Sequence, residues 1–215
     1  MKKHSIGFLL LCLPFIVHAQ TGQRKGLLRQ GGQFSLGVRS TLSTFSHGSW
    51  NENGYGAGGQ FRLQLTDRIN TEWFLDVIRT DIARVAYRND YHIGWSVMYY
   101  LVPTRDFRRP VTPYVQAGHC FDWTRIAPNG RRNELQQRGS SAVQAGIGTH
   151  FNITPRFDIS LSCQYMLHLG RELHAHVEGN EVHIEKHNNA GWEGHLLINL
   201  SANYKLLKLW KPRNG

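Results

Sequence analysis

Apolar and polar residues alternate along eight long segments of this chain. In the clearest segment, which runs from Phe157 to His168, apolar residues hold the odd positions and polar residues hold all but one of the even positions. Successive side chains of a strand point to opposite faces of its sheet, so this period predicts strands with one apolar and one polar face. The chain is therefore predicted to be all-β, with eight strands.

Strand length and connector length distinguish a membrane barrel from a soluble sandwich or barrel, whose strands show the same alternation. Strands of soluble proteins average about five or six residues, whereas a tilted membrane-spanning strand needs about nine to eleven. The eight segments are of the long type, and their connectors alternate between long and short, as in outer-membrane barrels with extended outer loops and tight periplasmic turns. The long connectors are 46–54, 81–90, 124–139 and 170–191, and the short ones are 67–70, 103–112 and 153–156. We therefore predict a single eight-stranded antiparallel transmembrane up-and-down β-barrel over residues 33–204.

Charged residues within the predicted strands fall almost entirely on the polar parity. A charge that faces lipid at mid-bilayer costs about 2–4 kcal/mol, and much less near the interface. The exception, Arg79, stands at the end of its strand beside a connector, where this cost is smallest. Side chains fill the interior of an eight-stranded barrel, so the other charges are predicted to form a buried, paired network and no large pore. These predicted interior residues are Arg39, Arg62, Glu72, Asp76, Asp122, Asp158 and Glu193.

The same assignment of faces leads to predictions for three further residues. His119 lies on the apolar parity in mid-strand, which requires either a bulge or a neutral imidazole there. Cys120 and Cys163 lie on opposite parities of strands that are not neighbours, so no disulfide is predicted between them.

Composition alone would indicate a soluble, basic protein. The 215 residues include 25 Lys+Arg against 15 Asp+Glu, a formal net charge of +10, and the mean hydropathy is −0.41. A hydrophobic content of 40% excludes a disordered chain. Beyond residue 20, no apolar run approaches the roughly 20 residues of a spanning helix. In a barrel, the low mean hydropathy is the average of an apolar outer face and a polar interior.

The two ends of the chain predict export and a basic periplasmic side. Met1-Lys2-Lys3 precedes an apolar run and a Val17-His18-Ala19 cleavage site, so residues 1–19 are predicted to be a signal peptide. Residues 20–32 are then a periplasmic segment and 205–215 a basic periplasmic tail. Basic residues concentrate on this side, where they would meet anionic lipid headgroups or peptidoglycan.

Histidines and glutamates crowd the last long connector, 170–191. The spacing of His174 and His176 suits chelation on a strand, and that of His183 and His187 suits a helical turn. No motif fixes a coordination geometry, so the alternatives of a metal site and of a solvated, pH-responsive loop both stay open. We expect no cofactor.

Several short motifs resemble the small eight-stranded outer-membrane β-barrel family of Gram-negative bacteria, of the OmpA and OmpX type. The resemblance covers about residues 33–204. It rests on the Ala19-Gln20 cleavage site, the opening strand Phe34-Ser-Leu-Gly-Val-Arg39, the strand Pro113-Tyr-Val-Gln-Ala-Gly118, and Gly146-Ile-Gly-Thr followed by Thr154-Pro155. Many members end on an aromatic residue, whereas this chain continues beyond Tyr204. The resemblance implies structural, adhesive, host-binding or secretory roles and, in a few members, lipid modification.

The sequence thus favours a non-enzymatic outer-membrane barrel with a structural role or a loop-mediated interaction or adhesion role, and no catalytic residue is assigned. A lipid A-modifying enzyme is the alternative: the His-x-Ser-Asn run of the deacylases is absent, but Ser46-His47-Gly48-Ser49 and Asp81 contain the residue types of an acyltransferase. A soluble lipocalin-like carrier is less consistent, because Gly48-Ser-Trp50 falls in a connector. The expected partners are outer-membrane lipids and lipopolysaccharide, the barrel-assembly machinery and a periplasmic or extracellular protein, and not nucleic acid.

Overall fold

The computed structural model describes residues 31–45, 53–104, 109–129, 135–178, 181–191 and 194–210. They form nine strands: β1 (Gln33–Phe45), β2 (Asn53–Gln64), β3 (Ile69–Ile82), β4 (Ala86–Tyr100), β5 (Val111–Pro128), β6 (Gln136–Asn152), β7 (Phe157–Glu178), β8 (Glu181–Gly191) and β9 (Gly194–Lys208). None of these described residues belongs to a helix long and apolar enough to cross a membrane. The predicted signal peptide, 1–19, lies outside the described residues.

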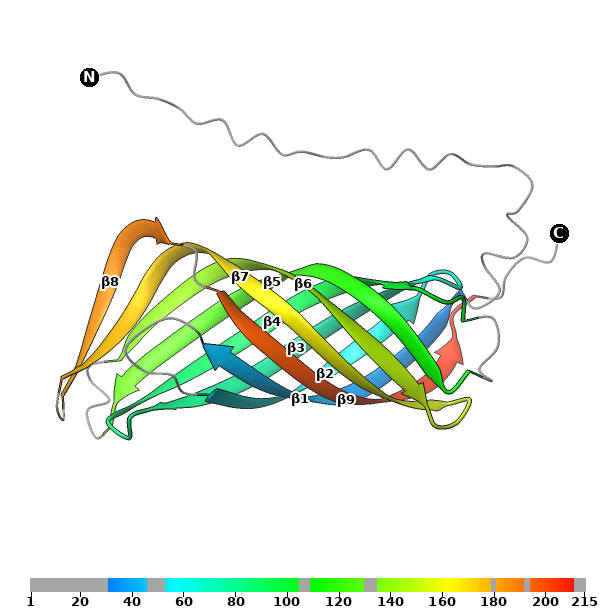
Figure 1. Ribbon diagram of the computed structural model, residues 1–215, viewed down its shortest axis with the longest axis horizontal. Helices are drawn as coiled ribbons and strands as arrows, with labels where there is room; N and C mark the ends of the chain where they lie inside the picture. The colour runs from blue at the N-terminus through cyan, green and yellow to red at the C-terminus, as the bar shows by residue number, and fades with distance from the viewer. Residues whose placement is uncertain are drawn as a thin grey trace, which may run out of the picture.

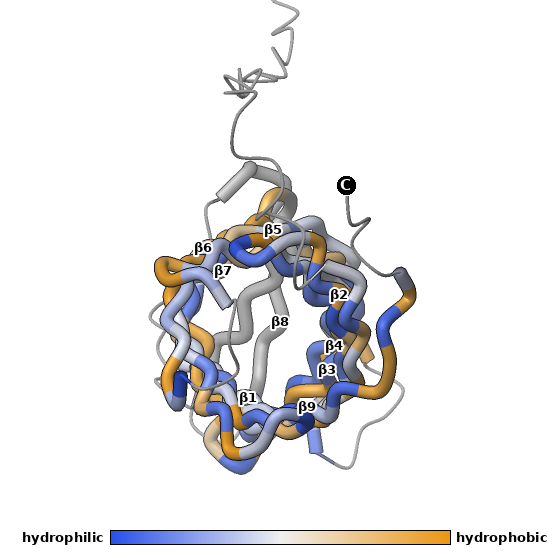
Figure 2. Tube along the Cα trace, turned by 90° about the vertical axis from the view of Figure 1, so that its right-hand side faces the viewer, coloured by the Kyte–Doolittle hydropathy of each residue, from blue (hydrophilic) through white to orange (hydrophobic). Residues whose placement is uncertain are grey.

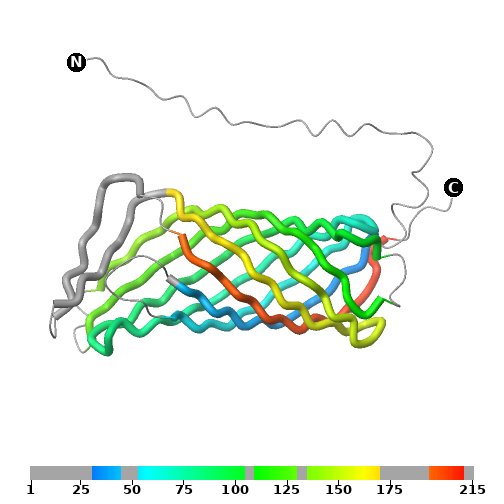
Figure 3. The backbone as a smooth tube through the Cα atoms, viewed as in Figure 1, coloured from blue at the N-terminus to red at the C-terminus, as the bar shows by residue number. Residues whose placement is uncertain are grey.

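Eight of these strands close into an antiparallel barrel. Each strand from β1 to β7 pairs with the next, and β9 joins the two ends by pairing with both β7 and β1. The strands are tilted about the long axis (Figures 1 and 3), and the view along that axis shows a closed ring (Figure 2). The ninth strand, β8, pairs only with the outer part of β7. The predicted eight-stranded up-and-down barrel is therefore confirmed.

The two faces of the barrel wall differ in chemistry as the alternation predicts. Inward residues are buried and mostly polar, as the strict exposed–buried repeat of β3 shows. Outward residues are apolar and exposed, including Val38 at 68% and Ile147 at 65%. This arrangement inverts that of a soluble barrel, whose apolar face points inward, and it excludes the lipocalin-like carrier.

The chain enters and leaves the barrel at the same end, which we call the terminal end. There the N–H of Leu209 donates to the carbonyl oxygen of Gly32 at 2.8 Å, and β9 runs on past Tyr204 to Lys208, which lies opposite Gln33 of β1. The predicted tight turns lie at this end. In the turn of residues 153–156, for example, the N–H of Phe157 donates to Thr154 Oγ1 at 2.9 Å.

Connectors at the opposite end, the hairpin end, are shorter than predicted. Most of 81–90 is strand, because β3 and β4 continue to the turn of residues 83–85. Ala83 and Arg84 adopt positive φ angles of 49° and 61° there. The Asp81 carboxylate accepts the Arg84 N–H at 2.7 Å, and Asn129 Nδ2 donates to the Arg84 carbonyl at 2.6 Å, so neighbouring polar groups hold this unusual turn.

The same difference applies to the other two long connectors that the structure describes. Much of 124–139 belongs to β5 and β6, and 170–191 forms the β7–β8 hairpin. The prediction of a helical turn at His183–His187 is wrong, because both residues belong to β8. Backbone pairing needs no lipid, so strands that span the membrane continue as a hydrogen-bonded ladder beyond it.

Candidate functional site: the barrel interior

The predicted interior charges lie inside the barrel. Six of them are at most 6% exposed: Arg39, Arg62, Glu72, Asp76, Asp122 and Asp158. The seventh, Glu193, lies outside the described residues. Because buried charges are tolerated only when they are paired and hydrogen-bonded, their partners determine what the interior does.

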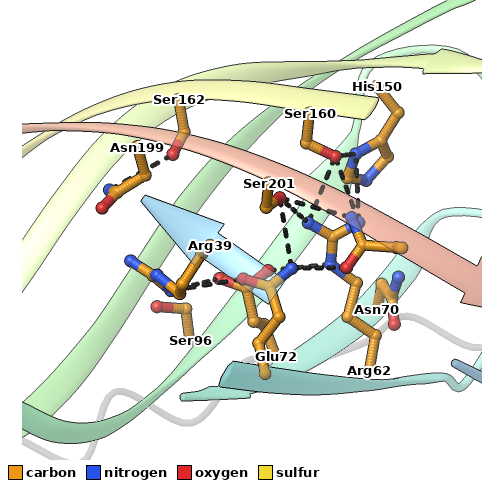
Figure 4. A network of polar contacts seen from close by, with 12 residues as sticks. Arg39, Arg62, Asn70, Glu72, Ser96, His150, Ser160, Ser162, Asn199 and Ser201 are labelled. Atoms are coloured by element: carbon orange, nitrogen blue, oxygen red, sulfur yellow. Dashed lines mark hydrogen bonds and ion pairs between the residues drawn. The ribbon is translucent and has the colours of Figure 1, made fainter. Parts of the chain in front are cut away.

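Five of the six form one continuous chain of alternating charge, in the order Asp76, Arg39, Glu72, Arg62 and Asp158, which we call the arginine–carboxylate chain. Figure 4 shows its middle members, Arg39, Glu72 and Arg62. Glu72 bridges the two arginines, accepting from Arg39 Nη1 at 3.2 Å and from Arg62 Nε at 2.8 Å. The outer links join Arg39 Nε to Asp76 at 3.1 Å and Arg62 Nη1 to Asp158 at 3.1 Å. Strands β1, β2, β3 and β7 each contribute to this chain, so it ties opposite walls of the barrel together.

Polar groups towards the terminal end continue the chain. Lys205 Nζ lies 3.6 Å from Asp158 Oδ2. The imidazole of His150 contacts Ser160 Oγ at 2.5 Å and the Tyr100 hydroxyl at 3.1 Å. Since these side chains come from β4, β6, β7 and β9, almost the whole circumference of the barrel is joined at this level.

A layer of apolar side chains crosses the interior beyond this chain. It consists of Phe74, Ile78, Cys120, Ala142, Met166 and Leu197, all at most 4% exposed. Along β7 Met166 lies between the inward Gln164 and His168, so the layer separates two polar levels.

Cys120 and Cys163 are both free cysteines, which confirms that they form no disulfide.

Beyond the apolar layer lies a second group of charges, the Asp122 cluster, made of Asp122, His92, Arg138 and His168. One carboxylate is its centre: Asp122 Oδ1 lies 3.4 Å from His92 Nε2, and its Oδ2 lies 3.4 Å from His168 Nδ1 and 3.8 Å from Arg138 Nη2. The ring of His195 lies against those of His92 and His168, with centroids 5.9 and 4.9 Å away.

A neighbouring ion pair extends the Asp122 cluster towards the hairpin end. Arg88 Nε donates to Asp90 at 2.9 Å, and Thr124 Oγ1 lies 2.6 Å from Asp90 and 3.1 Å from Asp122, so the two carboxylates share its one hydroxyl hydrogen. Sequence reasoning missed Arg88, Asp90 and Arg138 because it placed them in connectors. In the structure, the alternation of buried and less buried residues in β4 continues from His92 back to Ala86, and it places Arg88 and Asp90 on the inward face.

Histidine clusters raise the question of a metal site. Among the described residues, no group of three or more His, Cys, Asp or Glu side chains is placed to hold a metal ion. The side chains of the earlier candidates His174, His176, His183 and His187 lie outside the described part. Their backbone belongs to the β7–β8 hairpin, in which His176 lies opposite His183.

The two polar residues that the sequence placed on the apolar parity, Arg79 and His119, lie on the outward face, and both have partners. Arg79 places its Cζ atom 5.2 Å from the centroid of the Tyr87 ring. His119 Nε2 lies 2.5 Å from Ser141 Oγ on β6. The β5 pairing has no register shift around His119, so a hydrogen bond and not a bulge accommodates the imidazole.

Comparison with known proteins decides what kind of barrel this is. No family model and no curated protein matches the chain. Among solved structures, Neisserial surface protein A matches with a TM-score of 0.56 and 16% identity, covering 80% of this chain and 97% of that one. The outer membrane protein OprG of Pseudomonas aeruginosa matches at 0.53 and 11%, covering 83% and 98%. A major outer membrane protein of Thermus thermophilus matches at 0.53 and 7%, covering 80% and 99%.

The chain has the fold of the small outer-membrane β-barrels. In such a barrel the exposed apolar band faces lipid, and the polar interior is internal to the protein. The interior described above is therefore a sequence of filled layers: the arginine–carboxylate chain, the apolar layer and the Asp122 cluster. Its chemistry is that of a structural network.

Of the residues considered for an acyltransferase site, the structure describes only Asp81. Ser46, His47 and Ser49 lie outside the described residues. Asp81 belongs to the β3–β4 hairpin, where its carboxylate accepts the backbone N–H of Arg84, so its observed role is to stabilise a turn.

Proposed function

We propose that the protein is a non-enzymatic barrel of the bacterial outer membrane, exported by its signal peptide, which stabilises the envelope and presents its outer hairpins to a partner without forming a large pore. The observation that carries this proposal is the filled interior. Charged and apolar layers follow one another across the lumen, and their residues come from every strand of the barrel wall.

The height of the hairpins supports a role in interaction. On β3 the outward apolar residues end at Val77, yet the strand continues to Ile82. On β5 they end at Trp123, and the strand continues to Pro128. Paired strands therefore carry polar surface beyond the lipid-facing band, in a form more rigid than loops. Such a surface suits recognition by a periplasmic or extracellular protein, according to which side of the membrane the hairpin end faces.

Orientation follows from the usual arrangement of these barrels, in which short turns face the periplasm and longer connections face outward. The terminal end, with its short turns and the basic residues Arg68, Arg156 and Lys208, would then face the periplasm and its anionic lipid headgroups. The hairpin end would face the cell exterior. Assembly would require the barrel-assembly machinery, and lipopolysaccharide would surround the hairpin end.

Conductance tests the filled interior. Protein refolded into a planar bilayer is expected to leave the current at the level of a bilayer treated with detergent alone. Heat-modifiable gel migration of the same sample checks that the barrel is folded. A regular, large, stepwise conductance from folded protein would contradict the proposal.

Lipid analysis tests the absence of enzymatic activity. Mass spectrometry of lipid A from a strain that lacks the protein is expected to show the same acyl and phosphate groups as the parent strain. Loss of one acylated or deacylated species, restored by expression of the protein, would instead establish the lipid-modifying alternative.

A further inference from the structure

A row of polar side chains crosses five adjacent strands on the outward face, near the hairpin end. The strand register aligns Tyr55, Arg79, Asn89, Arg125 and Gln137 on β2, β3, β4, β5 and β6. All five point outward and are exposed or half-buried. This row is the outer boundary of the apolar band, because the next outward row towards the terminal end is made of Ala57, Val77, Tyr91, Trp123 and Gly139.

Two arginines of this row lean over the same strand, β4. Neighbouring strands lie about 4.8 Å apart, so Arg79 and Arg125, separated by one strand, have their Cα atoms roughly 10 Å apart. Arg79 Cζ lies 5.2 Å from the ring centroid of Tyr87, and Arg125 Cζ lies 5.6 Å from that of Tyr91. Both rings belong to β4, two residues to either side of Asn89, so both guanidinium groups lean over this strand, that of Arg79 towards the hairpin end and that of Arg125 towards the terminal end.

Neither arginine has a carboxylate partner among the residues that the structure describes. The acid nearest in sequence, Asp81, lies two positions beyond Arg79 and accepts the backbone N–H of Arg84. Interactions with tyrosine faces hold a guanidinium in place but do not neutralise its charge. Two arginines at the edge of a lipid-facing band therefore form a site for an anion, and the planar guanidinium suits a phosphate, which it can bind with two N–H groups.

An apolar groove begins next to Arg125, on the side of the terminal end. Its lining is mostly apolar, with Tyr91, Ile93, Phe121, Trp123, Gly139 and Leu169, and it also includes Ser140, Ser141 and the inward-facing Asp122. Gly139 keeps it open: a Cβ atom built there would have only the Trp123 ring within 4 Å, at 3.9 Å. A phosphate site at the top of an apolar groove on the lipid-facing wall matches a molecule with a phosphorylated headgroup and long acyl chains.

We propose that Arg79 and Arg125, with Asn89 between them, bind the headgroup of the phosphorylated glycolipid of the outer leaflet, lipid A, which carries two phosphates, and that one acyl chain lies in the groove next to Arg125. The choice of leaflet rests on the orientation given under the proposed function. The site itself rests on the row, the two arginines and the groove. It gives the barrel a fixed lipid neighbour beside its β3–β4 hairpin.

Native mass spectrometry of the refolded protein, titrated with lipid A that carries both phosphates, tests this site. The double variant Arg79→Gln, Arg125→Gln is expected to bind lipid A at least about tenfold more weakly, since hydrogen bonds to charged groups are lost. The matched control is Arg84→Gln, which removes one exposed arginine from the β3–β4 turn, outside the row, and is expected to bind like the wild type. Heat-modifiable migration confirms that each variant is folded.

Two further measurements separate the elements of the site. Lipid A from which phosphate has been removed is expected to bind the wild type as weakly as intact lipid A binds the double variant. Gly139→Leu, which fills the groove and keeps both arginines, is expected to weaken binding several-fold. Retained lipid A binding by the double variant would overturn the phosphate site, and equal binding of phosphatidylglycerol would overturn the assignment to a glycolipid. Each of these outcomes is independent of conductance and of lipid A modification, which test the proposed function.

Discussion

The arginine–carboxylate chain and the Asp122 cluster solve the same problem, that of placing charge inside a barrel, in different ways. In the chain, positive and negative groups alternate, and each of its inner members has two partners of opposite sign. In the cluster, a single carboxylate serves two histidines and an arginine. The first arrangement spreads its ion pairs over five residues in a line, whereas each of the contacts given for the second includes Asp122.

This comparison shows that burial alone does not determine how much each charged residue contributes to stability. Asp76 and Asp122 are both only 1% exposed, but Asp76 ends a chain and Asp122 is a hub. Removing one member of a buried pair leaves its partner as an uncompensated charge, and this is the main cost of such a change. The number of ion pairs and hydrogen bonds that a substitution removes should therefore decide its effect.

Arg62→Ala should have the largest effect, because Arg62 links Glu72 to Asp158 and also donates to Ser160. Its loss leaves two buried carboxylates short of a cation, so the free energy of unfolding should fall by about 3–5 kcal/mol. Urea-induced unfolding of the refolded barrel in lipid vesicles measures this. Arg156→Gln, on the surface, is the control and should change the midpoint little. If both variants unfold at the same urea concentration, the chain does not stabilise the barrel.

Asp122→Asn should come next. The amide keeps the shape of the carboxylate but removes its negative charge from beside His92, His168 and Arg138, so the loss should be about 2–3 kcal/mol, the cost of taking an ionised group away from buried polar partners. The same urea titration applies. A loss no larger than that of Asp76→Ala would show that the hub is not more important than the end of the chain.

Asp76→Ala should have a smaller effect, about 1–2 kcal/mol, because Arg39 keeps Glu72 as its partner. The substitution should lower stability without opening a conducting path, since the apolar layer still crosses the lumen. Heat-modifiable migration and bilayer conductance, measured on the same preparation, distinguish the two effects. Normal heat stability combined with a large increase in conductance would contradict the structural role of this aspartate.

The alternation of residue types was sufficient to predict the closed barrel and the inward direction of the interior charges that the structure describes. It could not predict which charges meet. Glu72 lies directly opposite Arg62 in the β2–β3 register, but its contact with Arg39 of β1 reaches over the intervening strand β2, and such contacts depend on how strongly the strands are staggered around the barrel.

The Asp122 cluster was predicted less completely for a different reason. Its centre lies in a segment recognised as a strand, while Arg138 and the adjoining Arg88–Asp90 pair lie where the lipid-facing pattern has already ended. Beyond the lipid band, outward residues need not be apolar, so only the inward parity keeps its pattern. A strand continuing into water therefore resembles a polar loop in sequence.

The smallest effect should come from the outward face, where polar groups lie in a different environment from those of the lumen. Ser141→Ala removes the hydroxyl that lies 2.5 Å from His119 Nε2 and should cost about 1 kcal/mol, the net value of one hydrogen bond. The double variant His119→Phe, Ser141→Ala replaces both partners with apolar groups and should recover most of this loss, because lipid accepts the phenyl ring. Urea unfolding of the two variants against the wild type measures the difference. If the double variant is less stable than Ser141→Ala alone, the imidazole has a role on this face that its hydrogen bond to Ser141 does not explain.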